Sequence, residues 1–340
     1  MTPVKGSSLV RTAILVAAVA VAGLLAWSSP GLLTRLPEST DPVVVAYSPF
    51  ESTALFWIAM DRHLFEENGI NVTVRRYHSG SLSLQGVVSG EADIAVGMSE
   101  FPMVRETFGN SPVSVFGNID RASFIYIIGR KDRGILNISD LKGKRVGTTN
   151  GTIAEFFLGR FLTLHGMEMH DITPVDIVAP EEWVSAVADG DIDAISTAQP
   201  YAFAARDRLG ENAIFWQAQG GQPLFGLVIA TDDWLREHPD QAVRFLRALA
   251  AAEEYAALHP AESRAIVQER LDLDPGYMDT VWEQNQFSLS LDQSLIMAME
   301  DEARWLMANG LVNASAVPDV RDHIHTESLE EVRPGSVNII

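Results

Sequence analysis

The chain has 340 residues, of which 47% are apolar and 8% aromatic, and its formal charge at pH 7 is −20. This length exceeds one comfortable single-core domain, so two lobes are expected, and the apolar content excludes a disordered chain. The negative charge disfavours nucleic-acid partners, and the absence of cysteine excludes disulfides, thiolate metal sites and cysteine nucleophiles.

Residues 1–41 are typical of an export signal. Lys5 and Arg11 precede an uncharged run from Thr12 to Thr34, and within it the segment 14–27 is almost wholly apolar. That segment is short for a membrane span, which needs about 20 residues, and it suits the apolar region of a signal peptide. Small residues near its end permit cleavage, and the alternative is an uncleaved N-terminal membrane anchor. We therefore expect a periplasmic or other extracytoplasmic location, with membrane association if the segment is retained.

A first α/β unit follows, in which apolar runs alternate with glycine turns. We expect strands at 43–46, 72–74, 92–96, 113–116 and 124–128, and helices at 53–68, 82–88 and 102–108. Ser79-Gly80-Ser81 suits a helix N-terminus, because serine accepts from orphan backbone N–H groups and glycine lets the backbone approach a ligand. A second small-residue turn, Gly97-Met98-Ser99, ends the strand at 92–96. The two turns predict half of a ligand cleft.

A second unit repeats this order. We expect a short helix near 139, strands at 145–147, 175–178, 192–196 and 214–215, and helices at 153–161, 181–188 and 201–206. Asn150-Gly151-Thr152 matches Ser79-Gly80-Ser81, and Thr152 with Glu155 has the spacing of a capping box. Gly90 and Gly190 each precede an acidic residue and an apolar strand. The matching turns predict two lobes that face one another.

The last third of the chain changes to long helical patterns. Gly220-Gly221 is a candidate second crossing between the lobes, before a strand that returns to the first. We expect that strand at 224–230, helices at 241–258, 260–271, 274–284 and 292–310, and a short apolar strand in the tail 329–340.

Motifs of catalysis are missing from the sequence. It contains no phosphate-binding loop, dinucleotide fingerprint, His-Glu-x-x-His or nucleophile elbow. His323-x-His325 is either a metal chelate or a solvated surface pair, and its charged segment favours the surface pair. Arg121, expected just past a strand end, is either a cationic anchor or a surface charge. We expect no catalytic residue, no metal site and no cofactor.

The three glycine turns carry the chemistry of binding. Backbone N–H groups and hydroxyls at helix starts present donors to a carboxylate, sulfonate, nitrate or ring acceptor. Each turn alone is equally explained as an ordinary capped turn, but all three fall at strand ends of matching units. Aromatic residues that are candidates for cleft walls, and equally for the core, are Tyr47, Phe50, Phe56, Trp57, Trp183 and Tyr201.

Four segments together resemble the periplasmic solute-binding proteins of ABC importers, in the branch for nitrate, sulfonate, taurine and thiamine-pyrimidine precursors. They are Glu66-Glu67-Asn68-Gly69-Ile70-Asn71-Val72, Gly90-Glu91-Ala92-Asp93-Ile94-Ala95, Ser139-Asp140-Leu141-Lys142-Gly143-Lys144-Arg145-Val146-Gly147 and Gly190-Asp191-Ile192-Asp193-Ala194. The resemblance implies a two-lobed α/β fold of type II with two hinge crossings and a helical C-terminal part packed on lobe 1. Lobe 1 would comprise 42–129 and 223–340, and lobe 2 would comprise 130–222.

The resemblance also implies a function and a set of ligand loops. The function is capture of a small organic or oxyanionic solute, such as a sulfonate, nitrate or a pyrimidine, and its delivery to the transmembrane subunits of an ABC permease. The loops place at the ligand Tyr47, Ser48, Phe50, Ser79, Gly80, Ser81, Gly97, Met98, Ser99, Asn150, Gly151, Thr152, Trp183, Thr197, Gln199 and Tyr201. Sulfonate- and taurine-type members tend to carry tryptophan and aspartate before the proline that is here Pro200. Ala198 and Gln199 stand there instead, which disfavours taurine.

Three other readings remain open. Pyrimidine synthases of the same fold look like intracellular enzymes with a lysine-bound pyridoxal phosphate, but Lys131, Lys142 and Lys144 lie in no candidate ligand loop. Porphobilinogen deaminase, similar in shape, tethers its cofactor through a cysteine, which this chain lacks. A membrane-tethered sensory domain would require an uncleaved N-terminal anchor.

Overall fold

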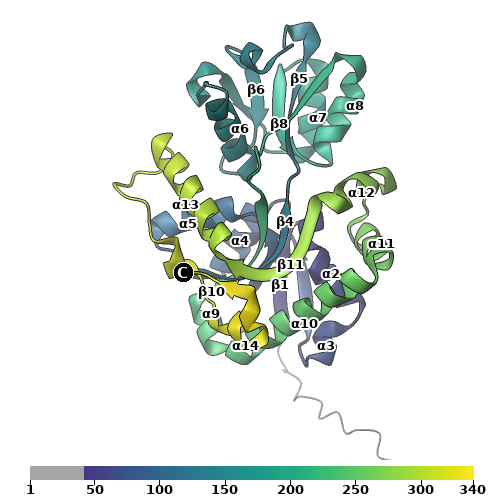
Figure 1. The fold of residues 1–340 in the computed structure, drawn as a ribbon, viewed down its shortest axis with the longest axis vertical. Coiled ribbons are helices and arrows are strands. Elements are labelled where there is room, and N and C mark those ends of the chain that lie inside the picture. The colour runs from purple at the N-terminus through teal and green to yellow at the C-terminus, as the bar shows by residue number, and fades with distance from the viewer. Residues whose placement is uncertain (1–41) are drawn as a thin grey trace, which may run out of the picture. The chain divides into compact units, whose positions relative to one another are not determined.

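The computed structural model describes the backbone of residues 42–340 and their side chains, except those of Pro180 and Glu181. Two β-sheets organise this part of the chain (Figure 1). We call the part built on a seven-stranded sheet lobe 1 and the part built on a five-stranded sheet lobe 2. The expected two-lobed α/β architecture is thereby confirmed, whereas the predicted export signal lies outside the described residues.

The sheet of lobe 1 has the strand order β12-β11-β4-β10-β3-β1-β2. Its strands are β1 (Val43–Tyr47), β2 (Val72–Arg76), β3 (Ile94–Met98), β4 (Val113–Ala122), β10 (Leu224–Thr231), β11 (Asn285–Asp292) and β12 (Val337–Asn338). β1 lies parallel to β2 and β3, with Val45 level with Ile94, whereas β10 is antiparallel to β3 and β4. The parallel strands β1, β2 and β3 therefore end at one edge of the sheet.

Ten helices belong to the described part of lobe 1. They are α2 (Ala54–Asp61), α3 (Leu64–Glu67), α4 (Gly80–Val88), α5 (Glu100–Gly109), α9 (Asp232–Glu237), α10 (Pro239–Leu258), α11 (Pro260–Leu271), α12 (Pro275–Val281), α13 (Gln293–Ala308) and α14 (Glu327–Val332). α10 buries one face against α2 and α3, where the rings of Phe56, Phe65 and Phe245 meet. The expected packing of the helical C-terminal part on lobe 1 is confirmed.

Lobe 2 has the strand order β7-β6-β8-β5-β9. Its strands are β5 (Ile125–Arg130), β6 (Arg145–Thr148), β7 (Thr173–Asp176), β8 (Ala194–Ala198) and β9 (Ala213–Gln217), and its helices are α6 (Ile153–Leu164), α7 (Pro180–Asp189) and α8 (Tyr201–Leu209). β6 is parallel to both β7 and β8. The carboxyl ends of these three strands therefore also share one edge.

Short 3-10 turns connect several elements. They are η1 (Glu51–Thr53), η2 (Lys131–Arg133), η3 (Ile138–Leu141), η4 (Met169–Asp171), η5 (Gly210–Asn212), η6 (Trp282–Gln284), η7 (Val320–His323) and η8 (Pro334–Ser336). Within residues 42–340, no helix is both long and apolar enough to cross a bilayer.

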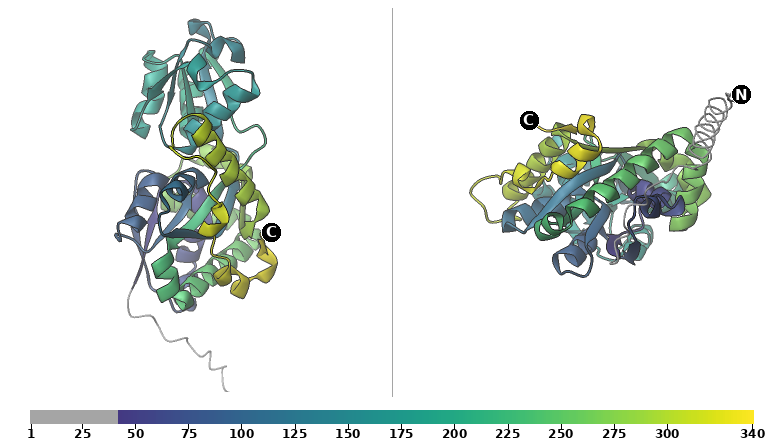
Figure 2. Two further views of the ribbon diagram at one scale, coloured as in Figure 1. Left: turned by 90° about the vertical axis from the view of Figure 1, so that its left-hand side faces the viewer. Right: turned by 90° about the horizontal axis from the view of Figure 1, so that it is seen from below.

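The chain crosses between the lobes twice, between β4 and β5 and between β9 and β10. Because β5 belongs to the sheet of lobe 2, we propose that the first boundary lies at 123–124 rather than at 129–130. The expected second boundary at 222–223 falls in the connection from β9 to β10. The helix α13 of lobe 1 extends toward lobe 2 (Figure 1, Figure 2). Its Trp305 packs on Phe156 of α6 with ring centroids 5.6 Å apart, so side chains also join the lobes.

Three expectations about the elements are wrong. The helix expected at 53–68 is interrupted by His63, whose φ of 57° is left-handed and separates α2 from α3. β11 was not expected, yet it pairs with β4 inside the sheet of lobe 1. Arg121 lies within β4, not past its end, and its guanidinium forms an ion pair with Asp292 of β11.

Candidate functional site

A cavity of about 500 Å³ lies between the lobes, at the carboxyl ends of the parallel strands of both sheets. This edge is where open α/β sheets bind small molecules. The lining residues on lobe 1 and at the crossing are Ser48, Phe50, Ser52, His78, Ser79, Gly80, Ser81, Leu82, Gly97, Met98, Ser99, Pro102, Phe124, Ile125 and Leu224. Those on lobe 2 are Thr149, Asn150, Thr152, Ile153, Ala154, Asp176, Val178, Ala179, Trp183 and Ala198.

The Ser79-Gly80-Ser81 turn forms one wall on lobe 1. Ser79 is the N-cap of α4, and its Oγ accepts a hydrogen bond from the N–H of Leu82 at 3.3 Å. Gly80 lies against the end of β3, because a Cβ at this position would stand 3.0 Å from the Cβ of Met98. The first N–H groups of a helix have no acceptor within it, so α4 presents donors to the cavity.

The Gly97-Met98-Ser99 turn lies beside it and requires its glycine. Gly97 has a φ of +67°, and a Cβ there would stand 2.5 Å from the Cγ2 of Thr53. The Ser52 hydroxyl donates to the Gly97 carbonyl at 2.6 Å. Ser99 is the N-cap of α5, but its side chain makes no capping hydrogen bond. The segment after β1 and the segment after β3 are thus locked together at the cavity.

The Asn150-Gly151-Thr152 turn faces the cavity from lobe 2 and is built differently. Its capping-box prediction is wrong: the Thr152 hydroxyl donates to the Thr149 carbonyl at 2.7 Å and caps nothing. The Glu155 carboxylate instead accepts from the N–H of Gly151 at 2.7 Å. Gly151 has a φ of +74°, so glycine is needed here for its backbone conformation.

Two further segments of lobe 2 complete the lining. Asp176, the last residue of β7, accepts from the N–H of Asn150 through Oδ1 at 2.9 Å. The carbonyl of Ile177 accepts from both the Thr149 hydroxyl, at 2.7 Å, and the Trp183 indole N–H, at 2.8 Å. The indole ring is therefore held in place where it contacts the cavity.

The cavity contains little formal charge. Among the described residues that line it, Asp176 and His78 are the only ones with a titratable side chain, and none is Lys or Arg. A nearby cation is Arg105 of α5, whose guanidinium lies beside Gly151. Burial raises the pKa of Glu155, and the Gly151 N–H and Arg105 offset this only in part. An anionic solute would therefore be bound mainly by helix N-termini and hydroxyls.

Buried carboxyl groups lie next to the lining on lobe 1. Glu51, which precedes Ser52, is 1% exposed and accepts a hydrogen bond from the Tyr277 hydroxyl at 2.7 Å. Burial raises the pKa of Glu51 to about 7, although the Tyr277 bond lowers it. Burial and the nearby Glu51 carboxyl raise the pKa of Asp120 well above its usual range. Between about pH 4.5 and pH 7, Glu51 and Asp120 therefore remain largely protonated, whereas an exposed carboxyl group would be ionised.

A second acid pair lies beneath α5. Glu100 accepts from the N–H of Phe225 at 3.0 Å, and burial raises its pKa to about 7. Burial and the adjacent Glu100 carboxyl raise the pKa of Glu302, on α13, well above its usual range. Neither group forms an ion pair with another described residue. The lobe 1 side of the cavity is accordingly backed by buried acids that are largely protonated below pH 7.

The structure brings most of the expected ligand residues together. Those that line the cavity are Ser48, Phe50, Ser79, Gly80, Ser81, Gly97, Met98, Ser99, Asn150, Thr152 and Trp183. Gly151 only shapes its turn. The other four, which lie outside the lining, are Tyr47, Thr197, Gln199 and Tyr201.

Each of those four side chains has a structural role or a buried position. Tyr47 packs edge-on against Trp57 at 4.9 Å between ring centroids. Thr197 is 2% exposed within β8, and Gln199 is fully buried, with its carbonyl oxygen accepting from the N–H of Phe203. Tyr201 packs edge-on against Trp183 at 4.8 Å.

Sequence reasoning missed several lining residues, of which His78 and Asp176 carry the most chemistry. His78 follows β2 and Asp176 is the last residue of β7, both strands of parallel pairs, so the rule that ligands bind at the carboxyl ends of strands was the available signal. Asp176 was placed inside the expected strand at 175–178, which hid its position at the strand end.

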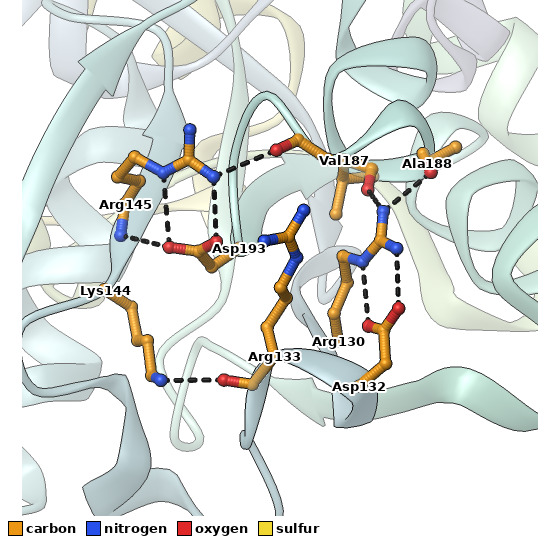
Figure 3. Close-up of polar contacts among 9 residues, drawn as sticks. Arg130, Asp132, Arg133, Lys144, Arg145, Val187, Ala188 and Asp193 are labelled. Carbon is orange, nitrogen blue, oxygen red and sulfur yellow. Dashed lines mark hydrogen bonds and ion pairs between the residues drawn. The ribbon is translucent and has the colours of Figure 1, made fainter.

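The lysines of the described part lie away from the cavity. Lys144 donates through Nζ to the Arg133 carbonyl at 2.7 Å, beside Arg145 at the start of β6 (Figure 3). Lys131 follows β5 and Lys142 precedes β6, and both strands reach the cavity with their opposite ends. A lysine-bound pyridoxal phosphate therefore does not fit this cavity.

The two other charged candidates also lie elsewhere. His323 is buried, not on the surface as expected, and its Nδ1 is 3.0 Å from the carbonyl oxygen of Val113. The Nε2 of His325 is 2.8 Å from the Ser328 hydroxyl. Within residues 42–340, no three His, Asp or Glu residues are placed to hold a metal ion. Arg121 is outside the lining.

Comparison with known proteins identifies one family and several relatives that cover most of this chain. The family described as NMT1/THI5 like matches residues 51–263. YtlA of Bacillus subtilis, provisionally named a binding protein, is 24% identical over 291 residues, which cover 83% of this chain and 84% of YtlA. A 4-amino-5-hydroxymethyl-2-methylpyrimidine phosphate synthase of Aspergillus parasiticus is 26% identical over 236 residues, covering 65% of this chain and 67% of the synthase.

A solved structure with the same fold is the alkanesulfonate-binding protein SsuA from Xanthomonas axonopodis pv. citri, bound to MOPS. Its TM-score is 0.72 at 19% identity, and the match covers 86% of this chain and 100% of SsuA. The expected periplasmic-binding-protein fold is confirmed by this likeness.

Proposed function

Because this chain belongs to the NMT1/THI5-like family, we propose that it is the extracytoplasmic solute-binding component of an ABC-type importer. It captures a small organic or oxyanionic solute between its lobes and delivers it to the transmembrane subunits of a permease. The provisional name of YtlA and the sulfonate ligand class of SsuA support this function for a chain of the same fold.

The observation that carries the proposal is the position of the cavity. Serine hydroxyls and the starts of α4, α5 and α6 line a space between two lobes that the chain joins by two crossings. Helix N-termini bind acidic groups without a cationic side chain. Closure of the lobes about the crossings would then surround the solute, and opening would release it.

The principal competing function is that of a pyrimidine synthase, which is the activity named for the Aspergillus relative. A synthase with lysine-bound pyridoxal phosphate needs a lysine at the reacting group, and no lysine is among the described lining residues. The donor set present here binds and orients a solute but offers no nucleophile for a Schiff base. We therefore favour binding without turnover.

A thermal-shift screen of the full-length protein tests this function. Sulfonates, nitrate, carboxylates and pyrimidines are added one at a time, and hits are titrated calorimetrically. We expect reversible micromolar binding, about −8 kcal/mol, and unchanged solute after prolonged incubation. Absence of stabilisation by every class, together with a covalently attached cofactor in the intact mass, would contradict the proposal.

Location and partner are tested separately. N-terminal sequencing of the protein recovered from cell fractions shows whether it is exported, cleaved or retained on the membrane. Loss of solute uptake in cells that lack the protein, restored by its return, would support delivery to a permease. Normal uptake with an altered transcriptional response would instead favour a sensory domain.

A further inference from the structure

We propose, on the basis of the solute-binding function above, that Asp176 gives the cavity a cation-binding pole. The preferred solute then carries a protonated amine or a ring N–H group as well as an acidic group. This assigns a specificity-determining role to a residue that the expected ligand loops omit.

The position of Asp176 supports this role. Its carboxylate lies at the end of β7, lines the cavity and is exposed to it. The N–H of Asn150 donates to Oδ1 at 2.9 Å, which orients the carboxylate beside the Asn150 turn. A carboxylate offers about four lone-pair positions, so one backbone donor leaves capacity for a solute.

The charges around Asp176 favour a cationic partner. No ion pair joins Asp176 to another residue of the described part, and no Lys or Arg lines the cavity there. Arg105 lies near Gly151, where both Arg105 and Asp176 act electrostatically on the buried Glu155 carboxyl, but no ion pair joins Arg105 to Asp176. A protonated amine on the solute would therefore be the counter-ion that the cavity wall does not supply.

The surface beside Asp176 suits an organic cation. Trp183 lines the same wall, with its indole N–H bound to the Ile177 carbonyl, and the face of an indole ring attracts cations. Val178, which is 72% exposed, adds apolar surface at the cavity. An amine carried on carbon chains or rings can use both contacts, whereas a hydrated metal ion cannot.

The acidic pole lies on the other lobe. Ser79 and Ser99 are the N-caps of α4 and α5, so the helix starts of lobe 1 favour an anionic group. A solute with both groups would contact lobe 1 through its acid and lobe 2 through its amine. A solute that carries both groups would contact both lobes at once, whereas a simple anion would contact lobe 1 alone. The solute with both groups would therefore stabilise the closed conformation of the two lobes more strongly.

Calorimetric titration of the full-length protein with a matched pair of solutes tests the inference. The pair is ethanesulfonate and 2-aminoethanesulfonate (taurine), which differ only in the amine. The lack of an aspartate before Pro200 disfavours taurine, whereas Asp176 would supply a carboxylate for the amine from β7. We expect the aminosulfonate to bind about tenfold more tightly, because a hydrogen bond to a charged group is strong when partly shielded from water. In Asp176→Asn, whose amide oxygen still accepts from the Asn150 N–H, the two affinities should become equal. Asp191→Asn, an exposed carboxylate of lobe 2 outside the cavity, is the control.

The outcomes separate the two proposals. Equal binding of both sulfonates by the unmodified protein, with no change in Asp176→Asn, would overturn the role of Asp176 and leave solute binding intact. Binding of neither sulfonate, nor of propionate and 3-aminopropionate, would overturn both. A preference for the aminosulfonate that persists in a folded Asp176→Asn variant would also overturn the role of Asp176.

Discussion

The two lobes hold their sides of the cavity by different means. On lobe 1 the glycine turns are fixed by close packing: a Cβ at Gly80 would stand 3.0 Å from Met98. On lobe 2 the matching turn is fixed by hydrogen bonds from Asn150 and Gly151 to the carboxylates of Asp176 and Glu155. The turns at Gly80 and Gly151 have similar sequences, but glycine is needed at Gly80 because a Cβ has no space there. At Gly151 it is needed because the backbone has a positive φ.

The acids behind the two walls differ as well. Lobe 1 contains the fully buried carboxyls Glu51, Asp120, Glu100 and Glu302, all with raised pKa. The carboxylate of lobe 2 that lines the cavity, Asp176, is exposed. Both lobes thus contain buried acids with a raised pKa, including Glu155 on lobe 2, but among the described lining residues the exposed carboxylate belongs to lobe 2.

The largest expected effect concerns the protonated acids of lobe 1. Because the pKa of Glu51 is about 7 in the folded protein and 4.5 for an unperturbed glutamate, the folded state holds the proton more tightly. The free energy of unfolding should therefore fall as pH rises from about 4.5 to 7, by roughly 3 kcal/mol for this group. Urea unfolding at several pH values measures the slope.

Substitution shows whether Glu51 causes that slope. Glu51→Gln keeps a side chain that can pair with Tyr277 but cannot ionise, so it should reduce the slope between pH 5 and 8. Glu67→Gln, on the exposed side of α3, is the matched control. An unchanged slope in Glu51→Gln would show that other groups account for the pH dependence.

An effect of intermediate size is expected when Gly80 and Gly151 are each replaced by valine. Gly80→Val should weaken solute binding by about 2 kcal/mol, because its side chain would displace Met98 at the cavity. Gly151→Val should instead lower the free energy of unfolding by about 1–2 kcal/mol through its positive φ, with affinity nearly retained. Calorimetry and urea unfolding give both quantities.

Gly90 provides the control for conformation alone. Its φ is +75°, and a Cβ there would meet nothing within 4 Å. Gly90→Val should therefore match Gly151→Val in stability and leave binding unchanged. Equal loss of affinity in all three variants would mean that the two walls are not built differently.

The smallest effect concerns the helix caps. Ser79→Ala removes the side-chain acceptor for Leu82 and should cost about 1 kcal/mol of unfolding free energy. Thr152→Ala removes only a bond to the Thr149 carbonyl and should cost about half as much. Urea unfolding without solute measures the difference, and a larger cost for Thr152→Ala would reverse the comparison.

The helix caps and glycine turns around the cavity could be predicted from the sequence, because they depend on residues that are neighbours in the chain. Ser79 caps its helix as expected, and Gly90 and Gly190 follow helices with positive φ. β11 was missed although Phe287, Leu289 and Leu291 alternate with polar residues, because residues 285–291 were left unassigned between two expected helices. The local alternation and the antiparallel pairing with β4 agree there, so the strand signal was present in the sequence.

The remaining errors depend on side-chain contacts, some local and some distant in the sequence, that the residue pattern did not indicate. Gln199 directs its carbonyl oxygen to the N–H of Phe203, and Tyr47 packs on Trp57, so neither side chain faces the solute space. Arg121 forms an ion pair with Asp292, which is distant in the sequence. Asp176 was missed for the opposite reason, because its strand ended earlier than expected.

The order of strands also has a consequence for how the chain folds during synthesis. All five strands of lobe 2 come from one continuous stretch, 125–217, whereas β4 of lobe 1 has β10 and β11 as its neighbours (Figure 1). The sheet of lobe 2 can therefore form all its strand pairs before residues 285–292 are synthesised. Until then, the edge of β4 that pairs with β11 remains unpaired. An unpaired strand edge is a template for wrong association, so a chain truncated before Asn285 would expose the region most prone to aggregate.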